Sequence, residues 1–495
     1  MKKFLSVLTL ALFSLLLVGC GDTTTANNTT NPTQAGTTTT GNSYENCTLT
    51  YAAWNLGSAD AESLSIERLM LQEFEKAYPG IKVQVVERPV DPTTGGDQKW
   101  DEFLAAKASV NMLPDVFQAD SIPYSVTNGW TYDCSEFTKN DTEYNSISTD
   151  ITDCATYNGK VMAIPQSVFY YGALVNNTLY ESKNIDAPTV ESTYDELMAA
   201  TKSAANHSSL SGSGVVGLEG IEHILHWLPA QYNTSYGWWT YDGEKFNLDS
   251  TEYVKTVTEY RKLRTDSTFV LEALQDEALK EGSTIVLEDI FGTTDYVNDE
   301  KILCRFVYSS EFGNFQAAID SGKLTCDYSF IGTPVVDGVK RVPIVLDFLC
   351  VSSQSEHPYE AYLLAKWMGF GDDGYQKRLD LSEENTDGTI GYVQYPSMTG
   401  NKEQLDKFFE IYTAFTDLRS IIEAGNFIVE PVKYLPGYNE ARYTGTYDAD
   451  NNMWQIMLKV MDGSVNISDI KTNLNSKANE LMKSAKDAML AALNK

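Results

Sequence analysis

The sequence predicts an α/β protein with two lobes, placed behind an N-terminal segment for export and anchoring. Three observations lead to this prediction. The first 42 of the 495 residues read as a charged start, a short apolar run and a polar stretch that cannot join a folded core. The remaining residues, about 450, are too many for one hydrophobic core. Within them, the order strand, helix, strand, helix, strand over residues 48–118 is typical of a parallel sheet covered by helices.

The N-terminus has the three parts of a secretory signal peptide, which we assign to residues 1–19. Lys2 and Lys3 precede an apolar run over residues 4–18, and this run is too short to be a comfortable membrane span. The run ends in Leu17-Val18-Gly19-Cys20. This sequence resembles the bacterial lipobox, in which the cysteine takes a diacylglyceryl group and becomes the mature N-terminus. We therefore expect lipidation of Cys20, and the alternative is a plain signal peptide with an incidental cysteine.

Residues 20–46 form the predicted tether. The stretch from Gly21 to Asn42 consists almost entirely of Thr, Asn and Gly and has no apolar face, so it should be disordered. A lipid followed by a polar tether predicts a globular domain held at the extracellular or periplasmic face of the cell membrane. The membrane contact is then expected through the N-terminal lipid only.

Charge and histidine content narrow the classes of partner. The formal charge of −31 argues against nucleic acid and anionic lipid surfaces as partners. Of four histidines, only His223 and His226 lie close together, at the i, i+3 spacing of a helix. They could form a zinc pair, but no further Cys or His stands nearby, so an ordinary helix surface is the favoured interpretation. We expect neither a metal nor a cofactor.

Six cysteines remain after Cys20, and an even number in an exported chain suggests disulfides. Six cysteines allow 15 pairings. Short loops favour the pairs Cys134–Cys154 and Cys304–Cys326, and a third pair, Cys47–Cys350, would follow by elimination.

The first elements follow from periodicity and turn residues. The expected strands cover residues 48–54, 81–85 and 114–118. The first helix, residues 59–78, carries an apolar stripe that includes Ile66 and Phe74 and ends at Pro79-Gly80. A second helix carries Trp100, Phe103 and Leu104. Residues 160–177 are rich in strand-forming side chains, and Pro165 within them marks a plausible crossing from one lobe to the other.

The later part of the chain is predicted to be mainly helical. Thr193 and Glu196 form a capping box for a helix over residues 193–205. Further helices are expected at 250–264 and 357–368 and in three stretches after residue 400. Strands are expected near 285–287, 305–308 and 327–331.

Five motifs follow one another along the folded part of the chain. Strand one ends in Ala53-Trp54-Asn55, and the segment 73–83 is similar to the pattern F-E-K-x-x-P-G-I-K-V. Residues 113–120, with Leu113-Pro114-Asp115 and Asp120, are similar to a P-D-V strand and its loop. The segment 157–165 matches Y-x-G-K-x-x-x-x-P, and residues 461–470 are similar to a turn into a last helix. Together and in this order, the five motifs resemble the maltose-binding-like group of extracellular solute-binding proteins of ABC importers.

The resemblance implies the type II periplasmic-binding-protein-like fold. In this fold two discontinuous lobes are joined by a hinge, and the ligand lies in the cleft between them. We place lobe 1 at residues 47–164 plus 333–371 and lobe 2 at 165–332 plus 372–495. The family further implies a monomer that delivers a carbohydrate, in particular an oligosaccharide, to the transmembrane subunits of an ABC permease.

Candidate ligand residues follow from what sugars need, which is aromatic platforms for the C–H faces and planar polar groups for the hydroxyls. Ligands in open α/β sheets gather outside the carboxyl ends of strands, and the chain has 29 tyrosines and 12% aromatic residues. Tyr170 and Tyr171 would point to opposite faces of a strand, so at most one should face the ligand. The candidates are Trp54, Asn55, Gln118, Asp120, Gln166, Tyr170, Tyr171, Trp227, Trp238, Trp239, Glu311, Phe312, Arg442 and Asp450.

Other interpretations stay open at this point. Trp54 could be a core residue, Asp120 could cap a helix, and the methionines of the late helices are best explained as core. The main alternative function is a surface-anchored enzyme acting on glycosides, for which Glu288-Asp289 and Glu383-Glu384 are adjacent carboxylates. A non-transport sugar sensor or adhesin is the third class. Peptides or other polar solutes remain alternative ligands.

Overall fold

The computed structural model describes residues 44–54, 56–57, 64–385 and 391–494. The predicted signal peptide, Cys20, most of the tether and the candidate Asn55 lie outside the described residues. From Tyr44 onward the chain forms one compact unit. Among the described residues, none of the helices combines the length and the apolar character that a membrane crossing needs.

The centre of this unit is a mixed sheet with nine described strands in the order β2-β1-β3-β10-β6-β8-β7. β11 pairs with β10, and β9 pairs with β6. A separate hairpin is formed by β4 (Thr156–Tyr157) and β5 (Lys160–Val161). The nine strands are β1 (Cys47–Ala52), β2 (Ile81–Val85), β3 (Val116–Gln118), β6 (Ile164–Asn176), β7 (Val216–Glu219), β8 (Ile302–Tyr308), β9 (Tyr328–Gly332), β10 (Val342–Val351) and β11 (Phe427–Val429).

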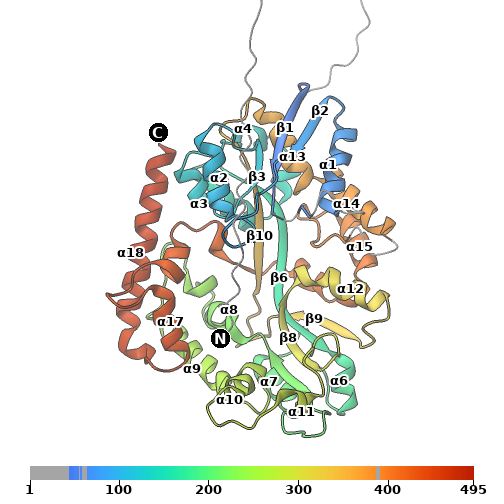
Figure 1. Ribbon diagram of the computed structural model, residues 1–495, viewed down its shortest axis with the longest axis vertical. Helices are drawn as coiled ribbons and strands as arrows, with labels where there is room; N and C mark the ends of the chain where they lie inside the picture. The colour runs from blue at the N-terminus through green and yellow to red at the C-terminus, as the bar shows by residue number, and fades with distance from the viewer. Residues whose placement is uncertain (1–43, 55, 58–63, 386–390, 495) are drawn as a thin grey trace, which may run out of the picture. The chain divides into compact units, whose positions relative to one another are not determined.

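Helices cover the sheet on both sides (Figure 1). The helices are α1 (Ile66–Ala77), α2 (Trp100–Ser109), α3 (Ile122–Thr127), α4 (Ser135–Thr138), α5 (Thr149–Thr152), α6 (Asn177–Ser182), α7 (Tyr194–Ala204), α8 (Ile224–Tyr232), α9 (Thr251–Arg264), α10 (Leu271–Ala278), α11 (Leu287–Phe291), α12 (Phe312–Asp320), α13 (Pro358–Met368), α14 (Asp372–Glu384), α15 (Lys402–Ile411), α16 (Leu418–Ala424), α17 (Met453–Met461) and α18 (Ile467–Leu493).

Most of the predicted elements are confirmed, and local chemistry explains their ends. β1 pairs in parallel with both β2 and β3, as the strand and helix order predicted. The Thr193 hydroxyl accepts a hydrogen bond from the Glu196 amide, and Glu196 accepts from the Thr193 amide, so the capping box starts α7. The predicted strand at residues 285–287 is wrong. No described strand pairs with this segment, and its exposed Val286 precedes the short helix α11 instead.

Two large hydrophobic cores and a small third one pack on the sheet, and the long strand β6 contributes side chains to both large cores. β6 pairs with β10 through residues 164–170 and with β8 and β9 through residues 171–176. Tyr170 therefore lies in the first core and Tyr171 in the second. Figure 1 shows β6 and β10 side by side between the two groups of elements. Leu174 of β6 lies in the first core and its neighbours Ala173 and Val175 lie in the second, so the two cores cover opposite faces of this part of the strand. The lobe crossing expected near Pro165 stays a prediction.

A glycine pair permits the close approach of β6 and β9. A Cβ atom on Gly172 would lie 2.3 Å from the Cα atom of Gly332. Gly332 itself has φ of +66°, which side chains other than glycine's rarely tolerate. Both positions are therefore restricted to glycine at the point where the sheet enters the second core.

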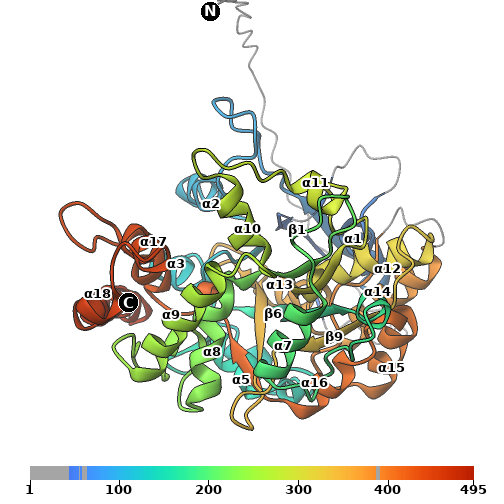
Figure 2. The same ribbon diagram turned by 90° about the horizontal axis from the view of Figure 1, so that it is seen from below.

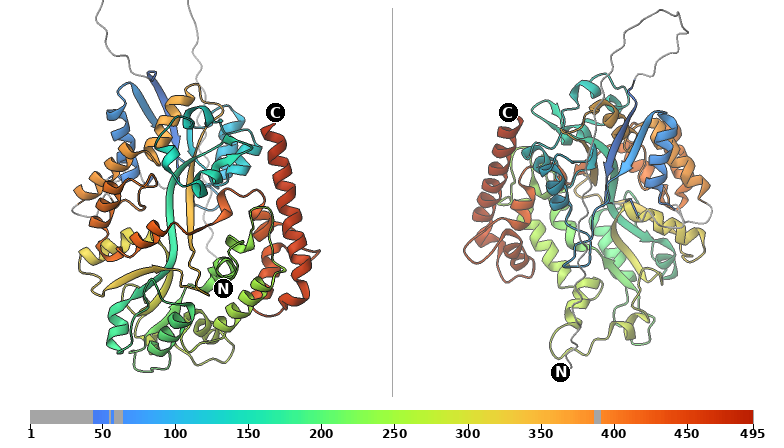
Figure 3. Two further views of the ribbon diagram at one scale, coloured as in Figure 1. Left: turned by 180° about the vertical axis from the view of Figure 1, so that it is seen from behind. Right: turned by 45° about the horizontal axis from the view of Figure 1, so that its top comes forward.

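Helix α18 contacts both cores. Its residues up to the middle of the helix, Leu474, Ala478 and Met482, belong to the second core, and Met489 and Leu493 of its last turns belong to the first. Figure 2 places α18 with α17 and α9 on one side of the sheet, opposite α12, α14 and α15. The left view of Figure 3 shows α18 running along the length of this side.

The predicted disulfides are absent, which corrects the sequence analysis. All six cysteines of the described residues are free thiols. Cys304 lies on β8 and Cys326 precedes β9, and these two strands flank β6 on opposite sides. Two strand spacings separate such positions by about 10 Å, beyond the reach of a disulfide. The Cys154 thiol instead donates to the Asp150 carbonyl at 3.1 Å, and the buried Cys134 thiol lies 3.8 Å from the Tyr132 carbonyl oxygen.

Candidate ligand-binding site

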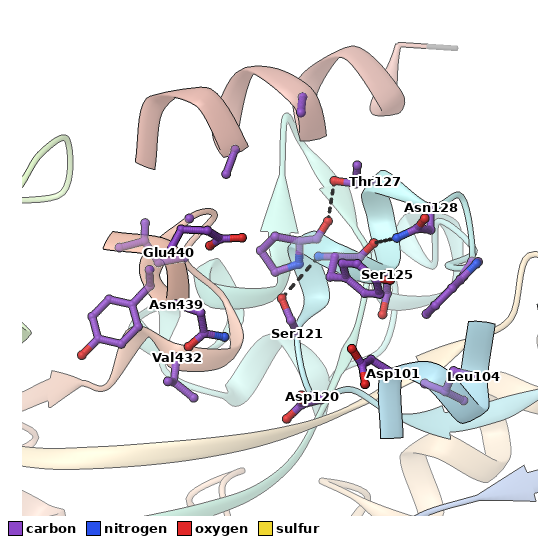
Figure 4. A pocket seen from close by; sticks show the side chains of 18 of the residues that line it. Asp101, Leu104, Asp120, Ser121, Ser125, Thr127, Asn128, Val432, Asn439 and Glu440 are labelled. Atoms are coloured by element: carbon purple, nitrogen blue, oxygen red, sulfur yellow. Dashed lines mark hydrogen bonds between the residues drawn. The ribbon is translucent and has the colours of Figure 1, made fainter. Parts of the chain in front are cut away.

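A cavity of about 450 Å³ lies beside the carboxyl end of β3, where the sequence analysis expected a ligand. Figure 4 shows it with the side chains that line it. One wall comes from α2, α3 and the loops around them, a second from residues 432–440, and a third from α18. The polar lining residues include Asp101, Asp120, Ser121, Asn128, Asn439 and Glu440, and the large aromatic ones are Trp100, Tyr124, Trp130 and Tyr438.

The wall at α3 is built by a short capped helix. β3 ends at Gln118, and the Ser121 hydroxyl then caps α3 by accepting a hydrogen bond from the Tyr124 amide at 3.3 Å. At the other end, the Asn128 side chain donates to the Tyr124 carbonyl at 2.9 Å. These contacts turn the Tyr124 ring outward, where it is 45% exposed and packs edge-on against Trp130 at 5.4 Å. An aromatic face is thereby available at the cavity.

The lining of this cavity has a distinct charge pattern. Three carboxylates, Asp101, Asp120 and Glu440, line it, and none of its described lining residues is Lys, Arg or His. Burial, together with the neighbouring Asp101, raises the pKa of Asp120, while Lys433 opposes the shift. Carboxylates and side-chain amides beside aromatic faces suit a neutral solute with many hydroxyl groups. They disfavour an anion.

Trp54 and Gln118 lie directly behind this lining. The Trp100 indole donates to the Gln118 carbonyl at 2.9 Å, and the Gln118 side-chain oxygen accepts from the Trp54 amide at 3.2 Å. The Trp54 ring meets Trp100 edge-on at 5.5 Å. Gln118 is fully buried, and its side-chain nitrogen has no hydrogen-bond partner within the described protein. Of the predicted residues, Asp120 lines the cavity itself, while Trp54 and Gln118 support the residues that do.

A partly buried ion pair lies between Trp54 and the central strands. Lys433 pairs with Asp347 of β10, and its ammonium lies 5.3 Å from the centre of the Trp54 ring. Asp347 also accepts from the Ser167 hydroxyl of β6 at 2.9 Å. Residues 432–440 are thus tied to both central strands at the edge of the cavity.

Glu430 is the strongly perturbed carboxyl group near this pair. Burial raises its pKa to about 7, although Lys433 acts in the opposite direction. Its backbone amide donates to the Ile344 carbonyl at 2.9 Å, which fixes the residue against β10.

The raised pKa predicts a pH dependence of stability that Glu430 controls. The folded state holds the Glu430 proton more tightly than the unfolded state does. The contribution of Glu430 to the free energy of unfolding is therefore fully present below about pH 4.5 and is lost as the pH rises through about 7. Glu430→Gln should remove this loss. The variant should gain up to about 3 kcal/mol over the wild type between pH 4.5 and pH 8.5, since one pKa unit corresponds to about 1.4 kcal/mol. Urea unfolding of both proteins at the two pH values measures the gain, and equal pH profiles would contradict the assignment.

A second cavity, of about 230 Å³, lies at the carboxyl ends of β7 and β8. It holds two of the predicted residues, Tyr171 and Glu311. Arg305 pairs with both Glu219 and Glu311 at 2.8 Å. The Tyr171 hydroxyl donates to the Gly220 carbonyl at 3.1 Å, so its position is fixed by backbone. Tyr170, on the opposite face of β6, lines neither cavity.

The predicted tryptophans of the second core are all buried. Trp227, Trp238 and Trp239 are at most 2% exposed. The Trp239 indole donates to the Tyr253 hydroxyl, and the Trp238 indole donates to the Tyr438 hydroxyl, both at 3.0 Å. Trp238 therefore contacts Tyr438, a residue that lines the first cavity, whereas Trp227 and Trp239 pack in the core.

The remaining predicted residues line neither cavity. Phe312 stacks on Phe415 at 4.0 Å in the first core. Gln166 is buried on β6, and Asp450 lies in an exposed loop. Arg442 is 2% exposed and lies among aromatic rings, with its guanidinium donating to His226 at 3.1 Å.

Of the two close histidines, His223 is partly exposed but His226 is buried, which corrects the expectation of a helix surface for His226. His226 is buried and stacks on Trp238 at 4.9 Å, and His223 lies beside it at 5.5 Å. Burial and the nearby Arg442 hold the pKa of His226 well below its ordinary value. Among the described residues, no group of three or more His, Cys, Asp and Glu side chains could hold a metal ion.

The sequence analysis did not predict several of the residues that line the first cavity. Trp100 was expected on a helix stripe, and Tyr124, Trp130 and Tyr438 were not singled out. A usable signal was present for Tyr124, because it follows Asp120 by one helical turn. Tyr438 and Trp130 come from segments without a clear strand end, so the rule about carboxyl ends could not find them.

The family comparison decides the class of the protein. The profile of the family described as bacterial extracellular solute-binding protein matches residues 59–370. The chain belongs to this family. Its mixed α/β architecture matches the two-lobe fold of solute-binding proteins, as predicted. The comparison with curated proteins gave no match.

Several solved structures are similar in fold to this solute-binding protein. One is an ABC substrate-binding protein from Listeria monocytogenes in complex with cycloalternan, with 17% identity, a TM-score of 0.62, and coverage of 88% of this chain and 99% of that one. Another is a cyclic α-maltosyl-1,6-maltose binding protein from Arthrobacter globiformis, with 15% identity, a TM-score of 0.61, and coverage of 88% and 99%. A third is the GacH receptor of Streptomyces glaucescens, with 14% identity, a TM-score of 0.56, and coverage of 88% and 98%.

Proposed function

We propose that this solute-binding protein captures a neutral carbohydrate, in particular an oligosaccharide, in the 450 Å³ cavity and delivers it to an ABC permease. The observation that carries the proposal is the lining of this cavity, in which aromatic rings stand beside carboxylates and amides without a basic side chain. Sugars need both kinds of group, one for the C–H faces and one for the hydroxyls. The similar structures described with cycloalternan and with acarbose support the same class of ligand.

Anchoring is part of the proposal. Cys20 in the Leu-Val-Gly-Cys sequence would carry the lipid, and the Thr- and Asn-rich tether would hold the folded unit at the outer face of the cell membrane. A lipid-anchored monomer would keep the captured sugar close to the permease. The chain length of the tether gives it reach, since polar linkers of this kind behave as flexible coils.

In the proposed mechanism, the sugar enters while the two lobes are apart and closure brings the three walls around it. β6 and β10 form the hinge, since they are the two longest described strands and pair with each other at the centre of the sheet. Asp120, Asn128 and Asn439 would pair with hydroxyl groups. The Tyr124 ring would stack on a sugar face. The permease would then recognise the closed form.

A sugar panel with two variants tests the function. Cycloalternan, maltose, maltohexaose and mannobiose are screened by thermal shift, since a ligand at 100 times its dissociation constant adds about 2.7 kcal/mol of stability. For a sugar that binds, Tyr124→Ala should weaken binding by about 1–2 kcal/mol, or roughly 5- to 30-fold, through the lost stacking area. Asp120→Asn should also weaken it. Calorimetry measures both.

The control variant is Tyr447→Ala, which removes a partly buried tyrosine that lines neither cavity. This variant should bind the sugar as the wild type does. Equal affinity of Tyr124→Ala, Asp120→Asn and the wild type would contradict the proposed site. Binding with turnover of the sugar would instead favour the enzyme alternative, although Glu288, Asp289, Glu383 and Glu384 are all exposed and line neither cavity.

A further inference from the structure

Helix α18 connects two parts of the protein that would move apart if β6 and β10 act as a hinge. Ala478 and Met482 are buried in the second core, and about two to four turns later Met489 and Leu493 are buried in the first core. α18 also packs alongside α3, which forms one wall of the cavity. Any opening about β6 and β10 must therefore release one half of α18.

The last turn of α18 is held by a specific contact. The Lys160 ammonium, on the β4–β5 hairpin of the first core, donates to the Leu493 carbonyl at 2.9 Å. A cation at the C-terminal end of a helix is favourable, since the last carbonyl groups have no partners within the helix and carry partial negative charge. Lys160 thus fastens the end of α18 to the first core.

The middle of α18 rests on a glycine of the second wall. Gly437 has φ of +75°, and a Cβ atom there would lie 2.6 Å from the Cα atom of Met482 and 3.0 Å from the Ala485 Cβ. A side chain at residue 437 would therefore push the helix away. This close approach leaves α18 seated against residues 432–440.

The same helix forms part of the cavity surface. Ala485 and Ala488 line the cavity opposite α3. Figure 4 shows a helix in the faded red of the C-terminus across the top of the cavity, above Thr127 and Glu440. Two alanines at this place leave the space open, whereas larger side chains would enter it.

We infer that α18 is a strap that closes one side of the ligand cavity, and that Ala485 and Ala488 set how large a ligand it admits. Lining residues of the other walls, such as Asp120, Asn128 and Glu440, are exposed, so α18 closes one side only, and this side opens when its last turns leave α3. The identity of the ligand as a carbohydrate rests on the proposed function, but the closure itself does not. A test without any sugar therefore separates the two.

Thiol labelling of the cavity tests the strap directly. Ser125 lines the cavity and is 3% exposed, so Ser125→Cys places a reporter thiol inside. The probe is iodoacetamide, and peptide mass mapping separates residue 125 from the six natural cysteines of the described residues and from Cys20. Adding Lys160→Ala should speed labelling by about tenfold, the factor expected for losing a hydrogen bond to a charged donor. Adding Ala488→Trp should slow it, because the indole fills the space beside α3.

The matched control is Lys486→Ala, which removes an exposed lysine of the same helix that lies off the cavity wall. It should leave the labelling rate unchanged. Equal labelling rates in the Lys160, Ala488 and Lys486 variants would overturn the inference, whatever the sugar panel shows.

Hydrogen exchange provides a second measurement in case Ser125→Cys does not fold. In Lys160→Ala of the otherwise natural chain, amides of residues 122–128 and 486–493 should exchange faster together, since α3 and the end of α18 would separate. Faster exchange of α18 alone would also overturn the inference, because α3 would then be covered by something else.

Discussion

Replacing Trp239 with Ala should lower the free energy of unfolding by about 3–5 kcal/mol, the range for deleting a large aromatic side chain from a core. Trp239 is fully buried, and its indole donates to the Tyr253 hydroxyl at 3.0 Å. Phe246 and Tyr438 meet its ring edge-on at 5.0 and 6.1 Å. The substitution leaves a cavity and removes the indole donor from the Tyr253 hydroxyl, which keeps only the weak Met457 sulfur acceptor at 3.8 Å. Urea unfolding followed by circular dichroism measures the loss.

Trp54→Ala is the comparison for this prediction. The Trp54 ring is partly exposed beside the ligand cavity, and its contacts are Trp100 and the Lys433 ammonium. We expect a smaller loss of stability, about 1–2 kcal/mol, because less apolar area leaves a buried environment. A sugar that binds the wild type should bind this variant more weakly, since Trp54 supports Trp100. A larger loss of stability in Trp54→Ala than in Trp239→Ala would contradict the placement of both residues.

Glu67→Ala should cost about 3–5 kcal/mol, since it leaves the buried Arg378 guanidinium without its counter-ion. Arg378 is 2% exposed, and its two terminal nitrogens donate to the two Glu67 carboxylate oxygens at 2.5 and 3.2 Å. The pair joins α14 to α1. Calorimetric unfolding at neutral pH measures the loss.

The double variant Glu67→Leu with Arg378→Met is the control, because it removes both charges and keeps apolar volume. It should recover most of the stability lost in Glu67→Ala, as replaced buried ion pairs often do. A single variant that unfolds like the wild type would mean that the pair is not buried in solution. The prediction also concerns the lobe boundary that we placed at residue 372. Tyr375 and Leu379 of α14 lie in the first core, so a loss that spreads through α1 and α14 together would favour moving α14 to lobe 1.

Elements with their own local signals could be predicted from the sequence. The capping box at Thr193 started α7 as expected, and Pro79-Gly80 ended the first helix within a residue or two of its observed end. β10 was missed. Its residues 342–351 are nearly continuously apolar, as in a strand buried on both faces, and periodicity does not distinguish such a run from a buried helix. The central strand of the mixed sheet therefore became visible only with its partners.

The candidate site was predicted only in part, because sequence patterns report local features and not contacts between distant segments. The end of β3 is a local feature, so Asp120 could be placed at the cavity. Whether an aromatic ring faces a ligand or a core depends on contacts distant in sequence. Trp239 meets Tyr438, and Phe312 meets Phe415, across gaps of about 100 to 200 residues that no local pattern reports. The aromatic-rich stretch around residue 238 was therefore predicted to contact the ligand, whereas the structure packs its tryptophans in a core.

The position of β10 has a consequence for how this chain folds during synthesis. β10 separates β3 from β6, and it pairs Cys350 with Phe117 and Phe348 with Pro165. A nascent chain that ends before residue 342 already contains the segments of β3 and β6. Their edges are unpaired, because β10 is the strand that lies between them. Contacts of such sequence separation form slowly, and unpaired edges invite association with other chains. We expect the partly synthesised protein to depend on chaperone cover until β10 arrives, so that truncations ending before residue 342 should aggregate rather than fold as a smaller domain.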